Sequence, residues 1–276
     1  MRALLFISLI ILLGCEEVVI VDLPQSQNLI VIEGWVTDTL GNHPIRITRS
    51  RPFSDQEQIA PIDDAQVIVQ SRSGQVFAYS YTPNGVYVSD FEYQGIANSE
   101  YRIIALIDSL EIRSEWDELP EKVEVGNIRV ESFEENDPDN PNQQITIYYP
   151  KLNAIDPEGI ANYYRWLFFK NDEVFNEPEP ITIQNDRLFD GNVIPNNFQS
   201  FGYDVGDEMT VQLMTISRDA HNYLSLLKSQ ITTLGTSGGT TPAIVNGNLF
   251  YVNDNSTLVL GYFGTAAISK NSLIVE

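Results

Sequence analysis

The sequence is poor in cysteine, histidine and basic residues, and each shortage excludes a class of function. One cysteine, Cys15, and two histidines, His43 and His221, occur in 276 residues, so neither a disulfide framework nor a histidine–cysteine metal cluster can be assembled. Lysine and arginine number 16 against 38 aspartates and glutamates, for a formal net charge of −22. This balance excludes nucleic acid as a partner, because binding a phosphate backbone requires clustered positive charge.

Long apolar runs are also scarce, and the one that matters lies at the N-terminus. Residues 3–13 form an apolar core of eleven residues behind Arg2. A bilayer span needs about twenty residues, so this stretch predicts a signal peptide over residues 1–14. The stretch Leu-Leu-Gly-Cys that ends at Cys15 resembles a bacterial lipobox, in which the cysteine is acylated and becomes the new N-terminus. We therefore predict that Cys15 carries a lipid that anchors the chain to a membrane.

Two acidic residues follow the predicted lipidation site directly. Glu16 and Glu17 resemble the signal that sends lipoproteins of the Bacteroidota to the outer face of the outer membrane. An ordinary solvated tether is the alternative, and residues 15–28 are predicted to form a lipidated tether in either case. The expected location is the outer membrane, with the chain lipid-anchored and facing the cell exterior.

Short alternating or β-branched runs dominate the rest of the chain and predict a mainly β protein. Seven such runs lie between residues 29 and 116, about ten residues apart and separated by turn signals. They predict an N-terminal β-sandwich over residues 29–114, resembling immunoglobulin-like or carboxypeptidase-regulatory-like modules. The acidic segment 115–127 is the expected linker. Residues 128–276 are expected to form a second β-sandwich-like domain.

One segment, residues 217–231, has helical periodicity. Ser217 or Asp219 can cap its N-terminus, since both side chains can accept a backbone hydrogen bond. The apolar residues recur at three- and four-residue spacing and make one stripe, which predicts packing against a sheet. The stripe consists of Ala220, Tyr223, Leu224, Leu227 and Ile231.

Catalytic motifs fail in their context. Residues 235–239 (GTSGG) match the G-x-S-x-G pattern of a nucleophile elbow, which requires a preceding strand, a following helix and a later histidine. Here the predicted helix precedes the motif and no histidine follows His221. We predict a protein that is not an enzyme and that has no cofactor. A hydrolase built on carboxylates remains an alternative, since 38 acidic residues cannot be sorted into pairs by sequence.

Two weaker patterns concern metal binding and glycosylation. Asp137 and Asp139 offer oxygen ligands to calcium, although two neighbouring prolines limit how their carboxylates converge, and a solvated loop is the alternative. The stretches DTL and DSL resemble the acceptor of protein O-glycosylation in the Bacteroidota. They make Thr39 and Ser109 candidate glycosylation sites.

An ordered series of stretches resembles one protein family. The chain is similar to the Bacteroidota outer-membrane lipoproteins grouped as domain-of-unknown-function family 4249, from Cys15 to the C-terminus. This resemblance implies an accessory role beside a TonB-dependent outer-membrane receptor in nutrient uptake, and it supplies no catalytic residues. A structural or assembly role in an envelope complex is the second hypothesis. The stretches are LLGC, VVIVDLP, LIVIEGWVTD, DDAQVIVQSRSG, YRIIALI, GDEMTVQLMTISRDAHNYL and LGYFGTAAISK.

The lipid anchor can be tested on whole membranes. We expect Cys15→Ser to leave the membrane fraction after a carbonate wash, because each buried acyl methylene contributes about 0.8 kcal/mol to anchoring. The measurement is the share of the protein that sediments with membranes, compared with the unmodified chain. Full retention of Cys15→Ser would show that something other than this lipid holds the protein.

Overall fold

The computed structural model describes residues 28–50, 60–138, 140–175, 179–234, 244–254 and 257–276. The described chain is mainly β, as predicted, with one α-helix. Its first half contains all seven strands expected between residues 29 and 116. The strands of this half are β1 (Ile30–Thr37), β2 (Ile45–Arg49), β3 (Ala60–Pro61), β4 (Gln66–Ser71), β5 (Val76–Thr82), β6 (Val86–Ser89), β7 (Glu100–Ile107), β8 (Leu110–Ser114) and β9 (Asp117–Glu118).

The second half contains longer strands and the helix. Residues at alternate positions of β12 and of the first part of β15 are buried, as expected for strands that place one face against a core, and the last four residues of β15 are all buried. The elements are β10 (Ile128–Asn136), β11 (Gln144–Leu152), β12 (Tyr163–Lys170), β13 (Glu173–Val174), β14 (Thr182–Asn185), the short 3₁₀ helix η1 (Asp186–Leu188), β15 (Glu208–Ile216), α2 (Arg218–Leu234), β16 (Leu249–Tyr251) and β17 (Leu260–Ile274).

The helix α2 begins where the sequence places it and ends three residues later than expected. Ser217 is the N-cap: its Oγ accepts a hydrogen bond of 3.1 Å from the backbone N–H of Ala220. Ala220 and Leu224 are buried against the sheet, which confirms the packing predicted for the stripe. Ile231 is 42% exposed, so the stripe is not buried to its end.

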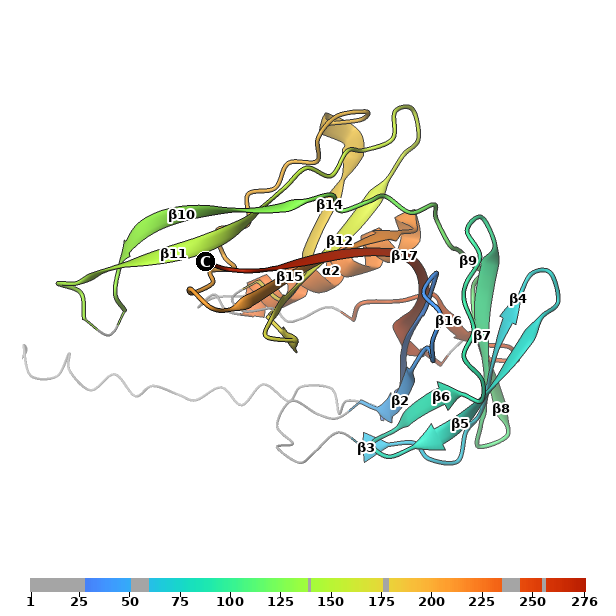
Figure 1. Ribbon diagram of the computed structural model, residues 1–276. Coiled ribbons are helices and arrows are strands. Elements are labelled where there is room, and N and C mark those ends of the chain that lie inside the picture. The colour runs from blue at the N-terminus through green and yellow to red at the C-terminus, as the bar shows by residue number, and fades with distance from the viewer. Residues whose placement is uncertain (1–27, 51–59, 139, 176–178, 235–243, 255–256) are drawn as a thin grey trace, which may run out of the picture.

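The sequence predicts two separate β-sandwich domains, and this prediction is wrong. Among the described residues, fifteen strands form one continuous mixed sheet, and β10 and β11 form a separate two-stranded sheet. β17 makes the connection, because it pairs in parallel with β1 and antiparallel with β15 (Figure 1). β16, which the sequence places in the second domain, pairs with β8 of the first half. Local alternation predicts strands but not partners, and the β1–β17 and β8–β16 partners lie more than a hundred residues apart.

The pairing of β17 changes at Ala266, from β1 before this residue to β15 after it. The register with β1 runs from Leu260 to Ala266, and the register with β15 runs from Ala266 to Ile274. Two aspartates bind backbone N–H groups on either side of this point. Asp117 accepts from the N–H of Thr265 at 2.7 Å, and Asp38 accepts from the N–H of Ile268 at 2.7 Å. A buried N–H without a partner is costly, so these carboxylates complete the sheet where its strands end.

Three apolar clusters pack against this sheet. The first lies in the N-terminal half and includes residues of β16 and β17. The second packs the inner face of β12 and β15 against aromatic residues of the segment 189–203. The third lies between the sheet and α2, which covers β12, β14 and β17 (Figure 1). β10 and β11 extend away from this body (Figure 1).

The close pairing of β1 with β17 depends on Gly261. Its φ is +93°, and a Cβ at this position would lie 2.1 Å from the carbonyl oxygen of Ile32. Gly74 has a similar φ of +96° but open space around it. Gly261 is therefore required both by its positive φ and by the close approach of the Ile32 backbone.

We expect Gly261→Ala to lower the free energy of unfolding by about 3–5 kcal/mol, because strain in φ adds to a backbone clash. Gly74→Ala is the matched control and should cost about 1–2 kcal/mol, since it carries the strain alone. Urea denaturation measures both. Equal losses in the two variants would contradict the tight pairing at Gly261.

Candidate functional site

A groove of about 430 Å³ lies where the first half of the chain meets the second. Its walls come from the segment that enters the second half, from the loop before β12, and from the start of α2. The lining residues are Asn98, Glu118, Pro120, Glu121, Lys122, Val123, Pro157, Ile160, Ala161, Asn162, Tyr163, Ile216, Ser217 and Arg218. The groove thus combines charged groups with exposed apolar and aromatic surface, which suits a binding site.

Two of the four charged groups that line the groove, Glu121 and Lys122, have polar or charged protein partners. Lys122 forms an ion pair of 2.9 Å with Asp38, and the Nδ2 of Asn98 donates to the Oε1 of Glu121 at 3.1 Å. Arg218 is different, because its Nε donates to the neutral hydroxyl of Tyr163 at 2.7 Å and its guanidinium lies 5.7 Å from that ring. Arg218 therefore presents a positive charge, fixed by an aromatic neighbour, to a negatively charged or hydroxyl-bearing ligand.

Behind the groove, Asp117 joins the two halves of the chain. Its Oδ1 accepts from the hydroxyls of Ser217 (2.6 Å) and Tyr262 (2.9 Å), and its Oδ2 accepts from the N–H and the hydroxyl of Thr265 (2.7 and 2.8 Å). Burial raises the pKa of Asp117, while these four hydrogen bonds act in the opposite direction. The carboxylate fixes the N-cap of α2 against β17 and so sets the position of one groove wall.

A second group of carboxylates lies beside the groove. Asp156, Asp186 and Asp190 place oxygen atoms within 4.8 Å of one another, and the first two are buried. Asp156 accepts from the hydroxyl of Tyr164 and from the N–H of Gly191. Asp186 and Asp190 are four residues apart, but Asp156 precedes Asp186 by 30 residues, so no local pattern in the sequence predicts the whole group. The turn residues around Asp156 and Asp190 are the only signal that was available.

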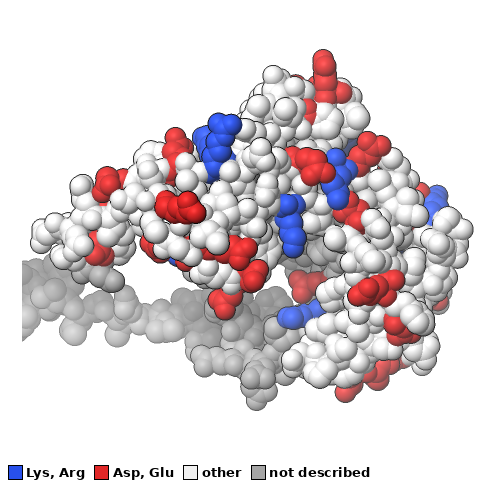
Figure 2. Space-filling view, viewed as in Figure 1, with Lys and Arg blue, Asp and Glu red and all other residues white. Residues whose placement is uncertain are grey.

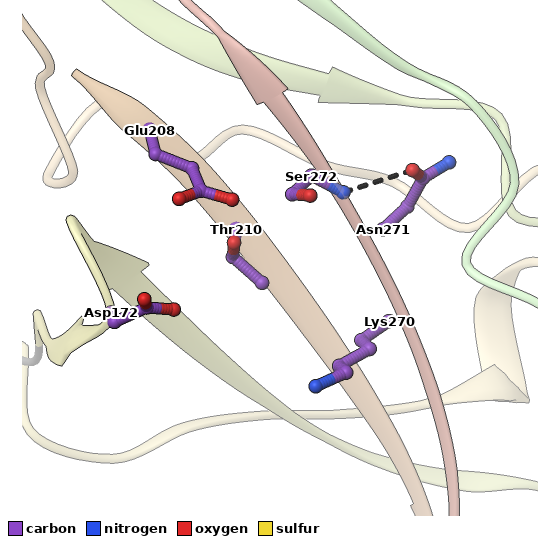
Figure 3. Close-up of a pocket in the computed structure, with 6 residues that line it drawn as sticks. All are labelled: Asp172, Glu208, Thr210, Lys270, Asn271 and Ser272. Carbon is purple, nitrogen blue, oxygen red and sulfur yellow. Dashed lines mark hydrogen bonds between the residues drawn. The ribbon is translucent and has the colours of Figure 1, made fainter.

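A smaller polar hollow of about 240 Å³ lies on the sheet (Figure 3). Lys270 reaches it from β17, Glu208 and Thr210 from β15, and Asp172 from the turn before β13 (Figure 3). Asp172 and Lys270 are exposed there, and Glu208 is half-buried. This hollow has no aromatic wall, so the groove is the better candidate for a ligand site.

The predicted site residues are spread over the chain. Cys15, Glu16, Glu17 and Asp139 lie outside the described residues, and the roles predicted for them stay predictions. Asp137 is at the tip of the β10–β11 hairpin and is not one of the three aspartates whose carboxylates the structure brings together. Acidic side chains are spread over the hairpin and over much of the visible surface (Figure 2).

The two candidate glycosylation sites are on the surface. Thr39 is exposed just after β1, and Ser109 is exposed in the turn between β7 and β8. Their preceding aspartates both have structural contacts: Asp38 binds β17 and Lys122, and Asp108 forms an ion pair of 2.8 Å with Arg49. Access is therefore available at both hydroxyls, and modification remains a prediction.

Comparison with known families gives one match, to the family described as Domain of unknown function (DUF4249), over residues 16–272. The chain belongs to this family. Its description assigns no activity to DUF4249 proteins, so the groove and the carboxylate group carry the functional argument. The comparisons found no match among curated proteins and none among solved structures. Within the described residues of this DUF4249 chain, no helix is long and apolar enough to cross a membrane.

We expect Asp117→Ala to lower the free energy of unfolding by about 3–5 kcal/mol, because it leaves several buried donors without an acceptor. Asp117→Asn should be milder, since hydroxyl groups can rotate to accept from the amide. The measurement is denaturation at several pH values.

The difference in stability between the natural chain and Asp117→Asn should also depend on pH. Because burial raises the pKa of Asp117 above its value in the unfolded chain, its contribution is fully present below the unfolded pKa and is lost as pH rises through the folded pKa. The stability of the natural chain relative to Asp117→Asn should therefore fall as the pH rises above the ordinary carboxyl pKa of about 4. A stability difference that grows with pH would contradict this assignment.

Proposed function

We propose that this protein is a lipid-anchored component of the outer membrane that faces the cell exterior and acts as a non-catalytic binding accessory of a TonB-dependent receptor. The lipobox-like stretch that ends at Cys15 and the acidic pair Glu16 and Glu17 support the anchor and its orientation. Membership of DUF4249 agrees with the resemblance from which the receptor was inferred. The acyl chains would hold the protein beside the outer face of the barrel, within reach of a membrane partner.

The observation that carries the receptor proposal is the β10–β11 hairpin, here called the arm. Its nine residue pairs run from Ile128↔Leu152 to Asn136↔Gln144, and every residue of β10 after Ile128 is exposed. An isolated two-stranded sheet is only marginally stable in water. An arm of this length, held at its base and extended from the body (Figure 1), is suited to contact another protein.

The side chains of the arm favour a protein partner. Val130 and Phe133 are 40% and 39% exposed, and the ring of Phe133 lies 5.9 Å from that of Tyr149. Glu135 accepts a hydrogen bond from the hydroxyl of Tyr149, and Glu134 from Thr146 at 2.9 Å. Apolar groups flanked by ordered carboxylates fit a partner surface that is apolar at its centre and basic at its rim.

The groove supports the other part of the proposal, that the accessory protein binds a ligand. Tyr163 and Arg218 offer an aromatic face and a fixed guanidinium, and Ile160 is 57% exposed. Such a mixed surface binds polar organic molecules through stacking and charge-assisted hydrogen bonds. We take the role to be non-catalytic because the buried carboxylates Asp117, Asp156 and Asp186 each accept hydrogen bonds from structural groups.

The decisive experiment is a gentle detergent pull-down of the tagged chain from outer membranes, with the partners identified by mass spectrometry. We expect a TonB-dependent barrel at about equal stoichiometry. Phe133→Ser should reduce its recovery roughly tenfold or more, because it removes the aromatic anchor of the arm.

Leu188→Ser is the matched control. Leu188 is 97% exposed outside the arm, so this variant should recover the barrel at the original level. Recovery of the chain alone would contradict the receptor proposal. Recovery with assembly machinery instead would favour the alternative role, a structural component of an envelope complex.

A further inference from the structure

The carboxylates of Asp156, Asp186 and Asp190 lie together without a basic partner in the described part of the chain. Asp156 is 1% exposed and Asp186 is 6% exposed, and no ion pair of the described residues includes any of the three. Negative charges so close together repel, and their removal from water is costly unless a cation compensates them. The four lone-pair sites of each carboxylate are only partly used by the hydrogen bonds present.

A separate observation comes from Asn162. Its side chain is 8% exposed, and its Oδ1 is buried with no hydrogen-bond partner. The backbone of Asn162 is paired with that of Asp186: Asp186 N–H donates to the carbonyl of Asn162 at 3.2 Å, one step beyond the Tyr163↔Asn185 pair of β12 and β14. Asn162 N–H also donates to the carboxylate of Asp186 at 2.6 Å.

This pairing places the side chains of Asn162 and Asp186 on the same face of the β12–β14 ladder. Directly paired residues of antiparallel strands place their side chains on the same face, and so do residues two apart along one strand. The side chains of Asp186 and Tyr164 therefore mark the face on which that of Asn162 lies. Tyr164 donates to Asp156 on this face. A buried acceptor without a donor, on the face where Tyr164 donates to one of these carboxylates, points to a missing positive ligand.

We propose that Asp156, Asp186, Asp190 and the amide oxygen of Asn162 form a calcium site. Calcium binds oxygen at 2.3–2.6 Å, so two oxygens on one ion are separated by at most about 4.6–5.2 Å. The mutual spacing of the carboxylate oxygens, within 4.8 Å, fits one ion. All four donors are hard oxygens, and a set of four protein oxygens suits calcium better than magnesium, which is usually bound by one or two carboxylates and several waters.

The site has a defined structural consequence. A calcium ion here cross-links the loop at 156–162 to the segment at 186–190, which carry the ligands. Pro157, Ile160 and Asn162 from the first of these loops line the groove. Calcium therefore fixes one wall of the groove. The site requires neither the receptor nor the lipid, so its failure would leave the proposed accessory role untouched.

The test is a calorimetric titration of the full chain in detergent with calcium chloride, after chelation and at about 0.15 M potassium chloride to screen the acidic surface. We expect one saturable site per chain. Calcium should also raise Tm by about 5 °C or more when present roughly a hundredfold above its dissociation constant. Asp190→Asn and, separately, Asn162→Ala should each weaken binding at least about tenfold.

Asp172→Asn is the matched control, because Asp172 is an exposed carboxylate in the same half of the chain. It should bind calcium as the natural chain does. The proposal is overturned if the natural chain shows no saturable binding. It is also overturned if Asp172→Asn weakens binding as much as Asp190→Asn, which would indicate diffuse attraction to the surface. Tighter binding of magnesium than of calcium would overturn the assignment of the ion.

Discussion

The fold depends on one strand, β17, that completes the sheet on both sides. Its first seven residues pair with β1 and its last nine with β15, and Ala266 belongs to both registers. The stretch from Gly261 to Ala267 is buried throughout. Because backbone groups buried in this stretch need partners, the exchange of neighbours at Ala266 leaves two N–H groups to be satisfied by side chains. Asp117 and Asp38 supply the acceptors, and each connects a different part of the chain to β17.

This arrangement explains where the groove lies. Asp117 binds Ser217 at the start of α2, and Lys122, five residues further on, binds Asp38. The segment between them crosses the junction of the two halves and forms one wall of the groove. The opposite wall comes from the loop before β12, which the carboxylates of Asp156 and Asp186 hold in place. A ligand would therefore meet a preformed surface, and little ordering would be lost on binding.

The sequence predicts the local elements well and their partners poorly. Periodicity and a capping serine are local, so the helix at 217–231 and the strands between 29 and 116 are predicted near their observed positions. The choice of β1 as a neighbour of β17 depends on Val31 meeting Leu260, more than 200 residues away, which no local pattern encodes. The candidate site is harder still to predict from the sequence. Asp186 is brought close by the β12–β14 ladder and Asp156 by the pairing of Ile155 with Val193, whereas the acidic loop containing Asp137 stands out by composition alone.

The central claim is that β17 makes the two halves one cooperative unit. Native-state hydrogen exchange of β1 and β15, followed by mass spectrometry at increasing urea, tests it most directly. Both strands should exchange with the same free energy and the same dependence on urea, because neither can be released without opening β17. If β1 exchanges at a clearly lower free energy while β15 stays protected, the halves unfold separately and the claim is contradicted.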